Sequence, residues 1–100
     1  MKIRRSKLEM NVAILNVLAQ KGPLKLTHIM YKANVNCNIL SEYLDFLINQ
    51  GLVEKRTIEK EHIVFKITQR GITVLKNFRE LTQALPIIEE FQRQTTPLLY

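Results

Sequence analysis

The alternation of apolar and polar positions predicts four helices and one hairpin. In "SKLEMNVAILNVLAQKG", Ser6 stands three residues before Glu9, the capping-box pattern in which each side chain binds a backbone N–H of the first helical turn. Apolar residues then recur at helical spacing, which predicts a helix over Lys7 to Gln20. Gly22 and Pro23 end it, because glycine adopts unusual φ values and proline has no N–H to continue the helix.

Two shorter helices are expected after a very short strand at Leu24 to Leu26. The first runs from approximately Thr27 to Ala33. The second runs from Cys37 to Asn49, and Gly51 follows it as a stop signal. Its apolar face consists of Leu40, Leu44 and Leu47. Tyr31 and Tyr43 are expected at the edges of the core, and the alternative is that a tyrosine hydroxyl at the rim reaches a phosphate.

The segment "NVNCN" between these two helices predicts a tight turn. Asn34 suits the left-handed conformation at a helix end. Asn36 can cap the following helix with its side-chain oxygen. Two short helices joined by such a turn form a helix-turn-helix.

A hairpin is expected next, with strands at Leu52 to Ile58 and His62 to Thr68 around "EKE". The turn lacks an Asn-Gly pair, so the loop should have about three to five residues. Thr68 then caps a fourth helix that begins at Gln69. In the second strand the alternation assigns an inward set, Ile63, Phe65 and Ile67, and an outward set, His62, Val64 and Lys66.

The fourth helix carries two apolar faces. Ile72 and Leu75 are placed to pack on the helix-turn-helix. The other face has the alternating spacing of a coiled-coil seam and consists of Val74, Phe78, Leu81, Leu85 and Ile88. A second apolar stripe would remain in water unless another chain covers it, which predicts a homodimer. The alternative is that this seam folds back over the first helix of its own chain.

Pro86 should kink or end the fourth helix near Leu85, because it removes a helical hydrogen bond. The tail "IIEEFQRQTTPLLY" is expected to form a short final turn against the partner. The predicted fold is therefore mainly α with a small β-hairpin, a winged helix-turn-helix with a C-terminal dimerisation helix. Its two parts are a DNA-binding region over residues 1–68 and a dimerisation helix with its tail over residues 69–100.

The amino-acid composition limits the functions that the chain can have. A chain of 100 residues with 46% hydrophobic residues forms one small core. Fifteen Lys and Arg against nine Asp and Glu, 15 − 9 = +6, favour a polyanionic partner. The single cysteine excludes an internal disulfide and a thiolate zinc cluster. No apolar stretch is long enough to span a bilayer, so a cytoplasmic location and no membrane partner are expected.

The positive charge is unevenly distributed along the chain. Residues 1–35 carry 7 − 1 = +6, residues 36–50 carry −2, residues 51–70 carry 5 − 3 = +2, and residues 71–100 carry 3 − 3 = 0. The third helix is therefore acidic, and phosphates would repel Glu42 and Asp45 on its outward face. Affinity for DNA should come from the residues around it.

Thirteen residues are candidate DNA contacts. A basic arm precedes the first helix, and further basic residues lie beside the second helix and in the hairpin, while polar side chains start the third helix. The alternative for any single lysine is that it only keeps the domain soluble. The candidates are Lys2, Arg4, Arg5, Lys7, Lys25, Lys32, Asn36, Asn38, Ser41, Lys55, Arg56, Lys60 and Lys66.

No catalytic chemistry is evident in the sequence. It contains no Gly-rich phosphate loop, His-Glu metal motif or nucleophile elbow, so no enzyme activity, cofactor or catalytic residue is predicted. His28, His62 and Cys37 lack the spacing of metal ligands, and Cys37 is expected to be a packed small side chain. No small-molecule ligand or effector is evident.

Four segments carry a family resemblance: "SKLE", "IMYKANV", "LSEYLDFLINQGLV" and "FKITQRGITVLKNFREL". Over roughly Ser6 to Leu81 the chain resembles archaeal winged-helix DNA-binding proteins, particularly the crenarchaeal ten-kilodalton chromatin protein family. The resemblance implies sequence-tolerant binding of double-stranded DNA by a homodimer whose C-terminal helices pair. It also implies a nucleoid-associated location. A sequence-specific transcription regulator is the alternative. A winged-helix module that binds protein is a third, favoured by the acidic third helix.

Overall fold

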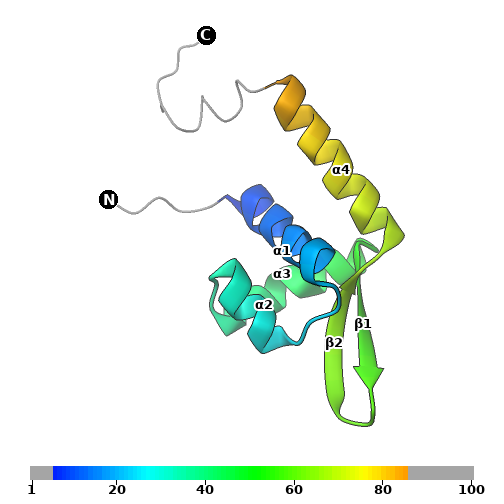
Figure 1. The fold of residues 1–100 in the computed structure, drawn as a ribbon. Helices are drawn as coiled ribbons and strands as arrows, with labels where there is room; N and C mark the ends of the chain where they lie inside the picture. The colour runs from blue at the N-terminus through cyan, green and yellow to red at the C-terminus, as the bar shows by residue number, and fades with distance from the viewer. Residues whose placement is uncertain (1–5, 86–100) are drawn as a thin grey trace.

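The computed structural model describes residues 6–85 and contains four helices and a two-stranded antiparallel sheet (Figure 1). The elements follow the order expected for a winged helix-turn-helix, so the predicted fold class is confirmed. In chain order they are α1 (Lys7–Lys21), α2 (Leu26–Ala33), α3 (Cys37–Asn49), β1 (Val53–Ile58), β2 (His62–Ile67) and α4 (Gln69–Ala84).

The predicted capping box starts α1. The Glu9 backbone N–H donates to Oγ of Ser6 at 3.0 Å, and the Ser6 N–H donates to Oε1 of Glu9 at 2.8 Å. The helix continues one residue beyond the expected end, to Lys21, and Gly22 follows with φ 84°. That positive φ is a conformation that glycine adopts without steric cost.

The turn between α2 and α3 has the conformation that its asparagines predict. Asn34 is left-handed, with φ 58° and ψ 58°. Oδ1 of Asn36 accepts a hydrogen bond from the Ile39 N–H at 3.0 Å and caps α3. Because both residues act through local backbone chemistry, the sequence was sufficient to place this turn.

The core lies where the first three helices meet the base of the hairpin. Buried leucine, isoleucine and alanine side chains from all three helices pack against β1 and β2. The expected strand at Leu24 to Leu26 is reduced to one bridge, because α2 already begins at Leu26. In that bridge the Phe65 N–H donates to the Leu24 carbonyl at 2.8 Å, and the Leu24 N–H donates back at 3.1 Å.

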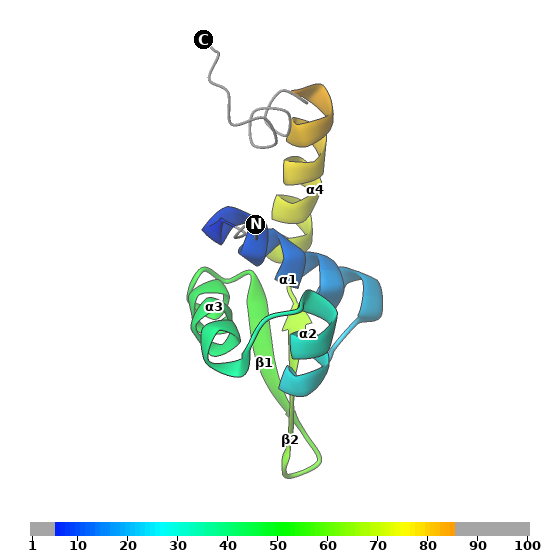
Figure 2. The same ribbon diagram turned by 90° about the vertical axis from the view of Figure 1, so that its left-hand side faces the viewer.

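The predicted inward and outward sets of β2 are only partly correct. Phe65 and Ile67 are buried as expected. Ile63 is 43% exposed, because the tip of the hairpin extends past the helices and offers it no core to pack on (Figures 1 and 2). Val64, predicted to face outward, is only 8% exposed. The loop between the strands has three residues, within the expected range.

Helix α4 begins at Gln69, as predicted, and projects from the body of the domain (Figure 1). Both Ile72 and Leu75 were expected to pack on the helix-turn-helix. Leu75 is buried, but Ile72 is 42% exposed. The helix ends at Ala84 with Leu85 as its C-cap, in agreement with the stop predicted near Leu85. Pro86, Ile88 and the tail lie outside the described residues.

Candidate nucleic-acid interface

Helix α3 presents a polar face to solvent beside the hairpin. The core takes up the opposite face through its three leucines. Four side chains at helical spacing are exposed on the outward face: Asn38, Glu42, Asp45 and Asn49. Ser41 is half-buried at its edge. A helix of 13 residues with one face free has the shape of the element that enters the major groove in helix-turn-helix proteins.

The start of α3 is the part of the helix suited to anions. The side-chain carbonyl oxygen of Asn36 accepts the capping hydrogen bond, which leaves the amide NH2 to donate to another molecule. Asn38, in the first turn, is exposed, and its side-chain amide offers both a donor and an acceptor. The helix dipole is positive at this end of α3. The repulsion of phosphates by the acidic side chains further along the helix is therefore weakest here.

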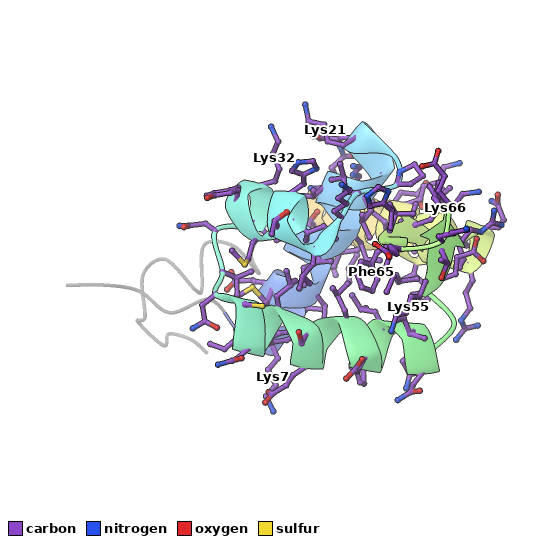
Figure 3. The ribbon with its side chains drawn as sticks, turned by 90° about the horizontal axis from the view of Figure 1, so that it is seen from below. Lys7, Lys21, Lys32, Lys55, Phe65 and Lys66 are labelled. Atoms are coloured by element: carbon purple, nitrogen blue, oxygen red, sulfur yellow. The ribbon has the colours of Figure 1, made fainter. Side chains whose placement is uncertain are left out.

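Lysines lie on both sides of the helix-turn-helix. Figure 3 shows Lys7 beside α3 on the side away from α2, whereas Lys21 and Lys32 project beyond α2 on the opposite side. Lys25 is also exposed, at the N-cap of α2. Lys21 was not among the predicted contacts, although a basic residue in the last turn of the first helix was visible in the sequence.

The hairpin carries less positive charge than its lysines alone suggest. Arg56 is held by Glu54, with Nε 2.9 Å from Oε2. In the register of the two strands, Lys66 lies opposite Glu54. Over residues 53–67, four basic residues face three acidic ones, 4 − 3 = +1. The ion pair is exposed, and such surface pairs contribute only about 0–1 kcal/mol, so a phosphate can replace Glu54.

The structure brings only some of the predicted contacts together. Lys55 and Lys60 are exposed on the hairpin, and Lys66 is half-buried. Tyr31 is 78% exposed on α2 and not at the edge of the core, whereas Tyr43 is half-buried as expected. Cys37, expected to be packed, is exposed in the first turn of α3. Lys2, Arg4 and Arg5 lie outside the described residues.

Three of the described seam residues of α4 are exposed in the single chain. Val74, Leu81 and Leu85 are 38%, 46% and 48% exposed, and Phe78 is half-buried. The alternative in which the seam folds back over α1 therefore does not hold for the three exposed residues. Helix α4 does meet α1 on another face, where Nη2 of Arg79 donates to Oδ1 of Asn16 at 2.5 Å.

Within residues 6–85 no group of three His, Cys, Asp or Glu side chains is arranged to hold a metal ion. None of the described helices has both the length and the apolar character needed to cross a membrane.

A family model described as a winged helix-turn-helix matches residues 4–85. The chain belongs to this family. An uncharacterized protein of the archaeon Methanocaldococcus jannaschii is 33% identical over 82 residues, which make up 82% of this chain and 78% of that protein. The resemblance to ten-kilodalton chromatin proteins is narrower than this assignment and stays a prediction.

Solved structures share the fold. The transcriptional regulator BldR from Sulfolobus solfataricus has a TM-score of 0.69 at 21% identity, over 83% of this chain and 60% of that one. A MarR-family transcriptional regulator from Silicibacter pomeroyi has a TM-score of 0.70 at 25% identity, over 92% and 60%. A Mycobacterium tuberculosis protein has a TM-score of 0.69 at 20% identity, over 81% and 58%. The chain thus spans about three fifths of these three proteins.

Proposed function

We propose that this protein is a transcription regulator that binds duplex DNA as a homodimer. The observation that carries the proposal is the exposed outward face of α3, which lies beside a projecting hairpin and has lysines on either side (Figures 2 and 3). Two of the proteins that share this fold, those from Sulfolobus solfataricus and Silicibacter pomeroyi, are transcriptional regulators. Their likeness favours regulation over a packaging role.

In this proposal, α3 enters the major groove with its first turn leading. Asn38 can pair with an adenine edge through its amide, and Glu42 can accept from the amino group of a cytosine. Lys7 on one side, and Lys21 with Lys32 on the other, would meet phosphates of the two strands that border the groove. The acidic residues then face bases rather than phosphates, which limits the repulsion.

The seam on α4 supplies the homodimer of the proposal. An exposed row of large apolar side chains on a helix that projects from the domain has the character of an interface between subunits. Pairing of α4 with its copy would hold two helix-turn-helix units on one DNA molecule. Two such units bind half-sites at a fixed separation, which gives a dimer greater sequence selectivity than one unit.

A second candidate is sequence-tolerant, chromatin-like binding in the nucleoid. It is favoured by the charge distribution, since the basic side chains surround α3 and its outward face carries none. Basic contacts of this kind bind phosphates and do not distinguish sequences.

Fluorescence anisotropy with a panel of unrelated duplexes, each titrated over a range of salt concentrations, separates the candidates. A regulator prefers one group of duplexes by a factor of about a thousand or more. Chromatin-like binding gives similar affinities that fall together with a steep salt dependence. Absence of binding at low salt would contradict both and favour a winged-helix module that binds protein.

A further inference from the structure

Three successive backbone carbonyls at the end of α3 accept hydrogen bonds from the start of α4. Nε of Arg70 donates to the carbonyl of Gln50, the C-cap of α3, at 3.1 Å. The Thr68 hydroxyl donates to the Gly51 carbonyl at 2.7 Å, and the Thr68 N–H donates to the Leu52 carbonyl at 2.9 Å. The start of α4 is therefore bonded to each residue of the segment that leaves α3.

Thr68 and Arg70 restrain α4 in different ways. Thr68 is the N-cap and precedes the first helical residue, so its bonds fix the point from which α4 starts. Arg70 lies within the helix, and its bond restrains the direction in which α4 leaves that point. A guanidinium group is favourable here, because the carbonyls at the end of α3 form the negative end of that helix dipole. Arg70 therefore ties the direction of α4 to α3.

A second arginine ties α4 to α1. Nη2 of Arg79 donates to Oδ1 of Asn16 on α1 at 2.5 Å. Beyond Arg79 the helix projects from the domain and carries the exposed seam residues Leu81 and Leu85 (Figure 1). The direction of the seam relative to α3 is thus restrained by two arginines that bind two different helices.

A small change in the direction of α4 produces a large displacement at the seam. Leu81 lies 81 − 69 = 12 residues beyond Gln69, the first residue of α4. At about 1.5 Å per residue, that is about 18 Å along the helix axis, so a tilt of about 10° at the start of α4 displaces Leu81 by about 3 Å. Successive base pairs of duplex DNA are about 3.4 Å apart. Such a tilt therefore moves α3 relative to the seam by nearly one base pair.

We propose that Arg70 and Arg79 are positioning residues that set the distance between the two α3 helices of the homodimer, and thereby the spacing of the half-sites that it binds. The inference rests on the proposed function, since it requires α4 to pair with its copy and α3 to enter DNA. Each arginine acts through the direction of α4. A dimer held rigidly in this way engages two half-sites together only at the separation that matches its two α3 helices.

Cys37 allows this distance to be measured on the natural chain. It is the single cysteine of the sequence and is exposed in the first turn of α3. A nitroxide label attached to Cys37 reports the distance between the two α3 helices of the homodimer by double electron–electron resonance, without DNA. The natural chain should give one narrow distribution of distances.

Two variants each remove one of the bonds: Arg70→Ala, and Asn16→Ala, which leaves every charge in place. Each should shift or broaden the distribution by about 3 Å or more, the displacement given by a tilt of about 10°. Lys76→Ala removes one positive charge at an exposed position of α4 and should keep the natural distribution. Circular dichroism and sedimentation equilibrium check that the variants fold and dimerise. Unchanged distributions in both Arg70→Ala and Asn16→Ala would overturn the proposal and leave the homodimer standing.

The effect on DNA is measured by selecting bound duplexes from a random-sequence pool. The natural chain should enrich one spacing between half-sites, and Arg70→Ala should enrich several. A single spacing shared by both proteins would overturn the role of the arginine on DNA. Failure of the proposed function gives different results. A monomeric natural chain shows no distance between labels and removes the homodimer together with this inference. A natural dimer that enriches no sequence contradicts the proposed regulator, whereas the label distances still decide whether the arginines set the separation of the α3 helices.

Discussion

The hydroxyl of Thr68 joins the start of α4 to the end of α3 by donating to the Gly51 carbonyl at 2.7 Å. The same oxygen accepts from the Gly71 N–H at 3.0 Å and caps α4. Arg70 adds a second link, from Nε to the Gln50 carbonyl at 3.1 Å. The direction of α4 is therefore tied to the helix-turn-helix by side chains that also cap and flank helix ends.

Replacing Thr68 by valine should lower the free energy of unfolding by about 1–2 kcal/mol, because the shape is kept while both hydroxyl bonds are lost. Thr68→Ser retains the hydroxyl and should lie within about 0.5 kcal/mol of the natural chain. Urea denaturation followed by circular dichroism measures both values. If Thr68→Val proved as stable as Thr68→Ser, the hydroxyl would have no structural role.

Gly71→Ala should destabilise the domain by about 1–3 kcal/mol, the usual cost of overpacking. An added Cβ would lie 2.7 Å from Cγ1 of Ile67 and still closer to the Leu52 carbonyl oxygen, which is backbone and cannot rotate away. Thr73→Ala, on the exposed side of the same helix, is the matched control and should change little. Thermal unfolding of the two variants tests this; a Gly71→Ala protein that melts with the control would contradict the close approach.

Local signals in the sequence predicted most element boundaries. Ser6, Asn36 and Thr68 act on backbone groups within three residues, so their caps could be read without knowledge of the fold. The exposure of Ile63 and the burial of Val64 could not, because they depend on how far the hairpin extends past the helices. Strand alternation gives two faces but does not say where a core ends.

For the candidate site, too, some features could be predicted from the sequence and others required the folded chain. Residue types alone indicated lysines and arginines as phosphate contacts. The pairing of Arg56 with Glu54 and the position of Lys21 across from Lys7 required the folded chain. The hollow that Lys7 and Asn11 of α1 line together with Ile39 and Phe46 of α3 could not be read from the sequence, since a whole helix separates α1 from α3.

The turn of the hairpin offers a stabilising change. Glu59 has φ 49°, a left-handed conformation that is unfavourable for residues with a Cβ. Glu59→Gly should raise the free energy of unfolding by up to about 1 kcal/mol and the melting temperature by a few degrees. Glu61→Gly, at a position of the same loop without positive φ, should be neutral or destabilising. Calorimetry that ranks the two variants the other way would refute this account of the turn.

Arg56→Ala should weaken binding to every duplex and reduce the steepness of the salt dependence, because a phosphate contact adds affinity without selectivity. Asn38→Ala should instead reduce, by about 1–3 kcal/mol, the difference in binding free energy between duplexes that differ at the base pair that Asn38 contacts. Anisotropy on the same duplex panel measures both effects. An equal loss of affinity for all sequences in Asn38→Ala would contradict its base-reading role. Asp45→Asn is the control that shows how a general change of charge on α3 affects binding.

The proposed homodimer requires that the seam of α4 stays apolar. Leu81 is 46% exposed in the single chain, in line with Val74 and Leu85 on the seam. Leu81→Glu would bury a carboxylate between paired helices, a change that an apolar interface does not tolerate. Sedimentation equilibrium should therefore show a monomer for Leu81→Glu and a dimer for the natural chain. Gln83→Glu adds the same charge on the opposite face of the helix and should stay dimeric. A dimeric Leu81→Glu protein would mean that the subunits associate through another surface, and a monomeric natural chain would remove the dimer altogether.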